Sequence, residues 1–290
     1  MHTRIVAVTT TAVLGAVALL LPVHSARAGS ALRPAVVAHR GASAVAPENT
    51  LEAVDRAASL GTLWVENDVQ RTRDGELVVV HDDSLRRTTD VEEVFPGRAP
   101  WRVKDFTAAE IARLDAGSWF GPDYAGVRVP TLTQYVDRVD RNHQKLLLEI
   151  KNPEIYPGIE QEVLKLLGDE GWLDERHLAN RLIVQSFSAD CLQTVHQLVP
   201  AVRIGLLGMP ALSDLPRFSV FADQINPSYH ALSQAYVAAV HELTGPHGRP
   251  MKVFTWTVDD AATARAVAGY GVDGVITDRP DVVRRALYWY

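Results

Sequence analysis

The sequence contains one cysteine and no long low-complexity tract. A single thiol, Cys191, excludes an internal disulfide, so the fold must be stable on packing alone. This cysteine lies in an apparent helix, SADCLQTV, where we expect it to fill space rather than to react. The chain has 290 residues, of which 47% are hydrophobic, and this indicates a globular protein with one large domain or two ordinary ones.

Long hydrophobic runs are also missing, with one exception at the amino terminus. An uncharged apolar stretch, 5–21, follows Arg4 and precedes Ala26-Arg27-Ala28, a small-x-small cleavage signature. We interpret residues 1–28 as a secretory signal peptide that is cleaved after Ala28, which predicts a secreted, extracellular protein with no stable membrane insertion. The alternative is a retained anchor, because the apolar stretch approaches the roughly 20 residues that span a bilayer.

Positive charge is scarce. The 29 lysines and arginines face 35 aspartates and glutamates, which gives a net charge of −6, and loss of residues 1–28 would remove two arginines and change it to −8. A surface of this sign repels nucleic acid and anionic membranes, so neither is an expected partner. An anionic small-molecule substrate would therefore need its positive counter-charge from a few local side chains or from a metal.

Short β-branched runs alternate with longer amphipathic stretches along the rest of the chain. The expected strands are residues 36–39, 63–69, 146–150, 182–186, 202–207, 223–227, 252–258 and 274–277. Helical patterns between them, such as TLEAVDRAASLG and GIEQEVLKLLGDEG, end in the glycine that is typical just beyond a helix. Repeated βα units imply a parallel sheet, and eight of them in about 255 residues predict a closed (β/α)₈ TIM barrel within residues 29–290.

One further run, LVVVH, ends at His81 and follows the second strand too closely for a parallel crossover. We expect the two to form an antiparallel hairpin. With a loop at 72–75, paired residue numbers sum to 147 and His81 lies opposite Glu66; with a turn at Asp74-Gly75 the sum is 149 and His81 lies opposite Asp68. Either register predicts an imidazole beside an acidic pair.

Residues 84–131 interrupt the βα rhythm. They contain polar sequence, the short helical pattern TAAEIARLDAG and the loop SWFGPDYAGVRVP. Excursions of this length from a compact domain are usually functional lids or walls. We therefore expect a small inserted subdomain after the second strand, over the mouth of the barrel.

Acidic residues gather where two expected strands end. Glu66 and Asp68 are two apart and so point to one face, and Glu149 and Lys151 repeat that spacing. The carboxyl ends of the strands are the face where barrel active sites lie. Three carboxylates converging there would repel one another unless a cation lay among them, and hard oxygen ligands favour Mg²⁺ or Ca²⁺ over zinc. The alternative is that these acids form salt bridges with Arg40, Lys151 or Arg71.

Two histidines close strands at the same edge. His39 is followed by Arg40-Gly41, and His81 by Asp82. A lone histidine at a strand end is usually a packed or capping residue, but two that flank one metal can serve as general base and general acid near neutral pH. Arg40 and Lys151 would supply the positive charge that a phosphate oxygen needs.

Other residues are weaker candidates. Glu48 belongs to a helix start that Asn49 or Thr50 would cap, and the alternative is that it orients Arg40. Three residues at strand ends are candidate contacts to a substrate: Gln185, Asn226 and Trp256. Trp256 is by default a core aromatic.

An ordered set of motifs runs from about Ala35 to Leu287. It comprises HRG with PENT, the E-x-D pair followed by DG and HD, and then RTT, LDAGSWF, VPTL, LEIK, QSF, TWTV and GVDGVITDRP. The chain with this set resembles the glycerophosphodiester phosphodiesterase family. The full ordered set is specific, whereas HRG or TD alone would not be.

The resemblance implies a (β/α)₈ barrel with an insertion after the second strand and one divalent cation, Ca²⁺ or Mg²⁺. It assigns the cation to Glu66, Asp68 and Glu149, and acid–base work to His39 and His81. One departure is Asn67, where an aliphatic residue is common in the family. This side chain should face the helix layer, so the departure concerns local packing rather than the metal site.

On this resemblance the expected activity is hydrolysis of glycerol-3-phospho-X to sn-glycerol 3-phosphate and the alcohol X. One alternative is a phospholipase D-like barrel acting on lysophospholipid or sphingomyelin, against which HRG, LEIK and the long insertion weigh. Another is a secreted protein that binds phosphodiesters without cleaving them, which would have no use for two histidines. The sequence does not identify X, which could also be part of a polymeric substrate. It also leaves open whether the ion is Ca²⁺ or Mg²⁺, which histidine acts first as the base, and what the oligomeric state is.

Overall fold

The structure is a computed structural model that describes residues 1–2 and 33–289. The apolar stretch and the cleavage site of the predicted signal peptide, Ala28 included, lie outside these described residues. Residues Leu32–Tyr290 form one compact unit. Among the described helices, none combines the length and the apolar character needed to cross a bilayer.

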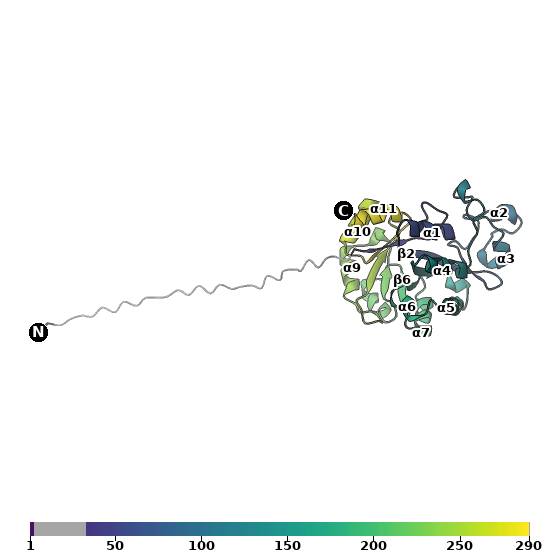
Figure 1. The fold of residues 1–290 in the computed structure, drawn as a ribbon. Coiled ribbons are helices and arrows are strands. Elements are labelled where there is room, and N and C mark those ends of the chain that lie inside the picture. Colours follow the sequence, from purple (N-terminus) through teal and green to yellow (C-terminus); the bar gives the residue numbers. More distant parts are fainter. Residues whose placement is uncertain (3–32, 290) are drawn as a thin grey trace. The chain divides into compact units, whose positions relative to one another are not determined.

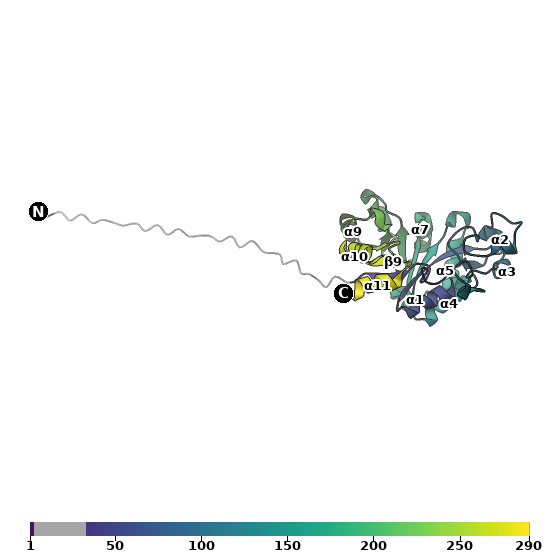
Figure 2. The same cartoon turned by 90° about the horizontal axis from the view of Figure 1, so that it is seen from above.

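Eight parallel strands close into a barrel, which confirms the predicted (β/α)₈ architecture (Figure 1, Figure 2). Around the ring the order is β1, β2, β4, β5, β6, β7, β8 and β9, and β9 pairs with β1. The barrel strands are β1 (Ala35–Ala38), β2 (Trp64–Arg71), β4 (Lys145–Ile150), β5 (Leu182–Ser186), β6 (Arg203–Leu207), β7 (Gln224–Asn226), β8 (Lys252–Thr255) and β9 (Gly274–Thr277). The expected strands differ mainly at their ends; the run at 252–258, for example, stops at Thr255.

Helices surround the barrel (Figure 1). They are α1 (Leu51–Ser59), α4 (Leu132–Arg141), α5 (Ile159–Asp169), α6 (Glu175–Asn180), α7 (Ala189–Leu198), α8 (Leu215–Phe218), α9 (Gln234–His241), α10 (Ala261–Gly269) and α11 (Pro280–Tyr288). Short 3₁₀ turns are η3 (Pro153–Ile155), η4 (Leu212–Asp214) and η5 (Tyr229–Ala231). Polar side chains cap several of the helix starts: at α1, for instance, Thr50 Oγ1 accepts a hydrogen bond from Ala53 N.

Strand residues alternate between the lumen and the helix layer. On β2, Val65 and Val69 are buried in the large apolar core between strands and helices, whereas Glu66 and Asp68 face the lumen. A separate apolar group, which we call the lumen cluster, fills the middle of the barrel: Val37, Leu147, Ile183, Phe254 and Ile276. Beside this cluster, hydrogen bonds link the buried side chains of Gln224, Asn226 and Gln185 in series.

The hairpin forms, but neither expected register is right. Strand β3 (Leu77–Val79) runs antiparallel to β2 with Val69 opposite Val79, so paired residue numbers sum to 148. Thr72 N donates to Glu76 O across a three-residue loop in which Gly75 has a φ of +93°. Three-residue hairpin loops need such a left-handed residue, and this geometry lies between the two that we expected. Because β3 ends at Val79, His81 has left the ladder and approaches the acids from a loop.

Residues 84–131 contain α2 (Val91–Val94), η1 (Val103–Asp105), α3 (Ala108–Ile111) and η2 (Pro122–Tyr124). In both views α2 and α3 lie at the end of the compact unit away from α9 and α10 (Figure 1, Figure 2). Their apolar side chains form a small core with β3: Val78, Val80, Leu85, Val91, Val103, Phe106, Ile111, Leu114, Ala116 and Val129. Tyr124 Oη donates to Val45 O, which ties this segment to the loop after β1.

Asn67 is fully buried on the helix-facing side of β2, as its position in the alternation predicts. Within the described residues, neither its Oδ1 nor its Nδ2 has a hydrogen-bond partner. Two unpaired polar atoms in an apolar layer destabilise a fold. The departure from an aliphatic residue therefore has a cost in packing, and it leaves the lumen face of β2 unchanged.

We expect Asn67→Val to raise the free energy of unfolding by about 1–3 kcal/mol, because it removes both unpaired atoms and introduces a β-branched residue that suits a strand. Urea denaturation measures the change. Asn67→Asp is the control with the opposite expected sign, since it buries a charge without a partner. Unchanged or lower stability in Asn67→Val would contradict this account.

Candidate active site

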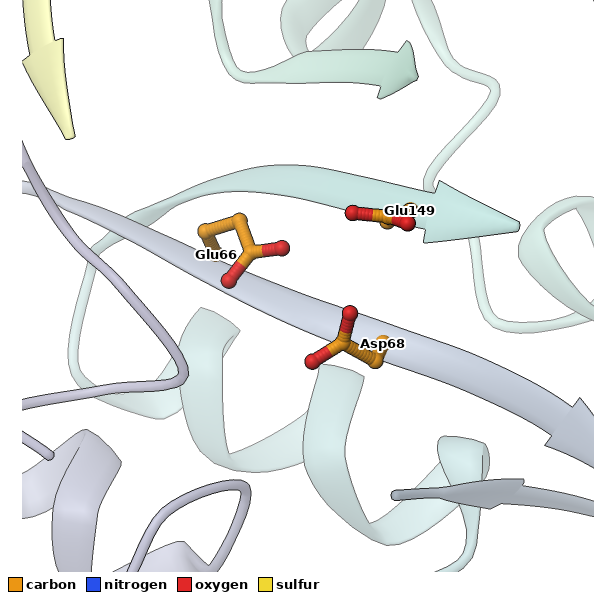
Figure 3. Close-up of side chains that lie close together, drawn as sticks. All are labelled: Glu66, Asp68 and Glu149. Atoms are coloured by element: carbon orange, nitrogen blue, oxygen red, sulfur yellow. The ribbon is translucent and has the colours of Figure 1, made fainter. Parts of the chain in front are cut away.

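Three carboxylates meet at the carboxyl ends of β2 and β4 (Figure 3). Asp68 pairs in register with Glu149 on the neighbouring strand, and Glu66 lies two residues before Asp68 on the same face. One oxygen from each residue lies within 4.8 Å of the others, and all three side chains are buried. The structure thus brings together the three residues that the sequence predicted as metal ligands.

Two cations accompany these acids. Lys151 Nζ lies 2.8 Å from Glu149 and 3.8 Å from Asp68, and Arg40 Nε lies 3.4 Å from Asp68. The backbone N–H of Arg40 donates to Glu66 at 2.9 Å. Some of the salt bridges that the alternative interpretation of these acids predicts, those of Arg40 and Lys151, are therefore present. Two positive charges still leave the three carboxylates with one excess negative charge.

The burial and mutual repulsion of these acids change their pKa values. Burial, and then the charges of Asp68 and Glu149, raise the pKa of Glu66 well above its usual value. Burial and the charge of Asp68 raise the pKa of Glu149 to about 7, although Lys151 opposes the change. For Asp68 burial acts in the same direction, but Arg40, His81 and Lys151 outweigh it and lower the pKa. The cluster therefore holds protons where free carboxyls would not.

One buried oxygen shows that the cluster fits a divalent cation. Asp68 Oδ2 accepts a hydrogen bond from Asn49 Nδ2 at 2.8 Å. Asp68 Oδ1 is also buried, yet no donor within the described residues bonds to it. A buried carboxylate oxygen without a donor, beside two further carboxylates, matches the oxygen-rich set that Ca²⁺ and Mg²⁺ prefer.

Each predicted catalytic histidine is paired with an aspartate through the same ring nitrogen. His39 Nδ1 lies 2.7 Å from Asp278 Oδ1, and His81 Nδ1 lies 2.6 Å from Asp82 Oδ1. A carboxylate at Nδ1 favours the tautomer with its proton there and leaves Nε2 to accept or donate. Both histidines line one cavity with Glu66, so the pair is positioned for proton transfer.

Arg87 links the inserted segment to the site. Its guanidinium contacts Asp82 at 2.7 Å and Glu48 at 2.7 and 2.8 Å. Glu48 in turn accepts a hydrogen bond from Arg40 Nη1 at 2.9 Å, as expected for a residue that orients Arg40. Hydrogen bonds from His81 and Arg87 lower the pKa of Asp82 despite partial burial. One side chain from residues 84–131 therefore fixes the carboxylates behind both His81 and Arg40.

The cavity has a volume of about 110 Å³. Eight predicted residues line it: His39, Arg40, Glu66, His81, Glu149, Lys151, Gln185 and Trp256. Phe187 adds an apolar wall; its exposed ring meets Trp256 edge to face at 5.9 Å, and Lys151 Nζ lies 5.8 Å from the ring centre. The cavity therefore combines charged side chains with apolar surface.

Asn226 lies behind this wall of the cavity and does not line it. Its Nδ2 donates to Gln185 Oε1 at 2.8 Å, and Gln185 Nε2 lies 3.4 Å from Glu66. The side chain of Asn226 is fully buried and bonded to Gln185, so a direct contact with a substrate stays a prediction for this residue.

Sequence reasoning gave no role to Asp278, Asp82, Arg87 or Phe187. Asp82 and Asp278 each stood in a quoted motif, next to His81 and directly after the last strand. The signal for Asp278 was its position, because an acid just beyond β9 lies at the same edge of the barrel as His39 on β1. Arg87 and Phe187 also stood in quoted motifs, RTT and QSF, and Phe187 directly follows β5, whereas no strand end marked Arg87.

Comparisons with known proteins agree with this geometry. Residues 39–282 match the model of the glycerophosphoryl diester phosphodiesterase family. A glycerophosphodiester phosphodiesterase of Bacillus subtilis is 35% identical over 289 residues, which cover 94% of each chain. The solved phosphodiesterase of Oleispira antarctica in complex with the product sn-glycerol-3-phosphate has a TM-score of 0.73 and 29% identity, with 87% of this chain and 96% of that chain covered.

Fold and site together define a (β/α)₈ barrel of the phosphodiesterase class. The chain belongs to the glycerophosphodiester phosphodiesterase family, since the family model and a relative of more than 30% identity both span most of its length.

The raised pKa values predict that binding of Ca²⁺ or Mg²⁺ releases protons. Near pH 6 Glu149 is largely protonated, because its pKa is about 7, and an ion must displace that proton. We therefore expect the affinity for either ion to rise with pH through about 7. Calorimetric titration in two buffers of different ionisation enthalpy measures the protons released. Glu149→Gln should weaken binding and reduce the pH dependence, to which Glu66 also contributes, and an affinity of wild type that is constant with pH would contradict the assignment.

The same shift gives the ion-free protein a pH dependence of stability. Between pH 4.5 and about 7 the folded state holds a proton on Glu149 that the unfolded state has lost. The contribution of Glu149 to the free energy of unfolding therefore falls as pH rises through that window. Urea denaturation with chelator present measures it, and Glu149→Gln is the control that lacks the effect.

Proposed function

We propose that this chain is a secreted, divalent-metal-dependent enzyme that hydrolyses a glycerophosphodiester to sn-glycerol 3-phosphate and an alcohol. The observation that carries the proposal is the pairing of His39 with Asp278 and of His81 with Asp82 in one cavity with Glu66. A structure that only bound phosphodiesters would gain nothing from two oriented imidazoles. The names of the relatives and the product bound to the Oleispira antarctica enzyme support the same substrate class.

The carboxylates of Glu66, Asp68 and Glu149 would hold Ca²⁺ or Mg²⁺. When bound, such an ion supplies positive charge that lowers the pKa of a substrate hydroxyl and neutralises a phosphate oxygen. Arg40 and Lys151 lie beside the same acids and add fixed positive charge. Their role is to bind the phosphate and to stabilise the negative charge that grows on it during the reaction.

The two histidines carry the protons. One removes the proton of a glycerol hydroxyl, whose oxygen attacks phosphorus, and the other gives its proton to the departing alkoxide. Water then opens the resulting cyclic phosphate while the two histidines exchange roles. Asp278 and Asp82 hold the rings by Nδ1 and stabilise each imidazolium as it forms.

Export is the second part of the proposal. It is supported by the charged start, the apolar stretch 5–21 and the Ala26-Arg27-Ala28 signature of the sequence. Amino-terminal sequencing of the protein from the culture medium of a secreting host is expected to begin at Gly29. Recovery of the intact chain in the membrane fraction would overturn it.

His39→Ala and His81→Ala should each lower the release of glycerol 3-phosphate from glycerophosphocholine by at least about a hundredfold, because each removes a general acid or base. The circular-dichroism spectrum should be unchanged. Asp278→Asn should lower turnover less and shift its pH profile, since the ring remains but loses its orienting charge. Near wild-type turnover in either alanine variant would refute the two-histidine scheme.

Two further arms of that assay address the alternatives. Chelator should remove activity, and added Ca²⁺ or Mg²⁺ should restore it. A comparison of lysophosphatidylcholine with glycerophosphocholine as substrates distinguishes the proposed enzyme from a phospholipase D-like enzyme, which would cleave lysophosphatidylcholine in preference. Substrate binding without product formation would instead identify a binding protein. His196→Ala is a matched control, because this histidine lies on α7 outside the cavity and should leave turnover intact.

A further inference from the structure

A second cavity lies at the opposite, amino-terminal end of the barrel and has a volume of about 200 Å³. Three cations enter it from equivalent positions: Lys145, Arg203 and Lys252 are the first residues of β4, β6 and β8. These are alternate strands of the ring, whose side chains share one layer of the lumen. Such layers usually consist of bulky aliphatic residues, so three cations in one layer call for an explanation.

We call this group the cationic layer. Within the part of the chain that the structure describes, Lys145, Arg203 and Lys252 form no ion pair with a carboxylate, and neither does Arg249 on the rim. Two acids, Asp223 and Asp273, also line the cavity and offset part of this positive charge, although neither forms an ion pair with the cationic layer. Asp223 accepts from Ile204 N and contacts His247, while Asp273 accepts from Val253 N and contacts His241.

The cations crowd one another. Burial, and then the charges of Arg181, Arg203 and Lys252, lower the pKa of Lys145. Burial and the charge of Arg249 likewise lower the pKa of Arg203, although Asp223 opposes the change. A chain with a net charge of −6 thus gathers four cations against two carboxylates around one cavity. Mutual repulsion there costs stability, and a bound anion would relieve it.

The lumen cluster separates this cavity from the active site. The ring of Phe254 lies so close to Gly274 that a Cβ on that glycine would be 2.6 Å from it, which closes the lumen between β8 and β9. Leu147 lies between Lys145 and Glu149 on β4. Ligands of the two cavities therefore occupy different ends of the barrel.

We propose that the cationic layer binds a small phosphate-type oxyanion with two or more negative charges. The guanidinium groups of Arg203 and Arg249 match the bidentate geometry of such an anion, and Lys145 and Lys252 add mobile point charges. This site is distinct from the proposed catalytic function and does not depend on it.

Calorimetric titration with pyrophosphate, on the chelator-treated protein at about 20 mM salt, tests the proposal. Wild type should bind one pyrophosphate, and acetate under the same conditions should not bind. Arg203→Gln should weaken pyrophosphate binding at least about tenfold, because it removes a charge-assisted contact. Arg56→Gln is the matched control: it removes the same charge from an exposed position on α1 and should leave the affinity unchanged.

The Lys151→Gln variant tests whether pyrophosphate binds in the active-site cavity instead. Binding that survives in Lys151→Gln but falls in Arg203→Gln supports the cationic layer, and the reverse pattern places the anion in the active site and overturns the proposal. The proposal also fails if wild type does not bind, or if Arg56→Gln weakens binding as much as Arg203→Gln does.

Stability gives a second measurement if a variant folds poorly. Because the cations repel one another, Arg203→Gln should have a melting temperature equal to or higher than that of wild type in anion-free buffer. Pyrophosphate should raise the melting temperature of wild type but not that of Arg203→Gln. A large loss of stability in Arg203→Gln, with no stabilisation of wild type by pyrophosphate, would mean that the cations serve the fold and would overturn the proposal.

Discussion

Repulsion among three buried carboxylates is the constraint on which the rest of the site depends. Glu66, Asp68 and Glu149 share a space of less than 5 Å, and Arg40 and Lys151 balance only part of their charge. The protein tolerates the remainder by holding protons on Glu66 and Glu149 when no ion is bound. A site arranged in this way gains stability from a divalent cation, so its ligand affinity and its fold are coupled.

The surroundings of the two histidines differ, although each ring meets an aspartate at Nδ1. Asp278 belongs to the barrel and also accepts a hydrogen bond from Ser43, whereas Asp82 is held by Arg87 from the inserted segment. Arg87 further fixes Glu48, and through it Arg40. Movement of the inserted segment would therefore affect His81 and Arg40 together, and leave His39 in place. The insertion acts as part of the site and not only as a wall above it.

The strands and the acidic cluster followed from the sequence because both depend on local periodicity. Glu66 and Asp68 share a face on any strand, and the carboxyl ends of parallel strands meet at one edge. The hairpin register failed because it depends on the conformation of Gly75 in a three-residue loop, which composition does not reveal. Asp278 and the cationic layer required closure of the ring, since their partners come from strands far apart in the sequence. The bond of Asn226 to Gln185 was not predictable either, because the same strand-end pattern suits a contact with a substrate and a contact with a neighbouring amide.

The two ends of the lumen carry opposite charge, yet one cannot neutralise the other. On β4, Lys145 and Glu149 are four residues apart and face the same side, so about 13 Å separates their backbone positions at roughly 3.3 Å per residue. At that distance, with an effective dielectric constant of about 20, the attraction between two unit charges is about 1 kcal/mol. Lys151, at 2.8 Å from Glu149, acts far more strongly and still leaves the pKa of Glu149 at about 7. Each end must therefore be balanced locally, which is the basis of the proposed divalent cation among the carboxylates and of the proposed oxyanion at the cationic layer.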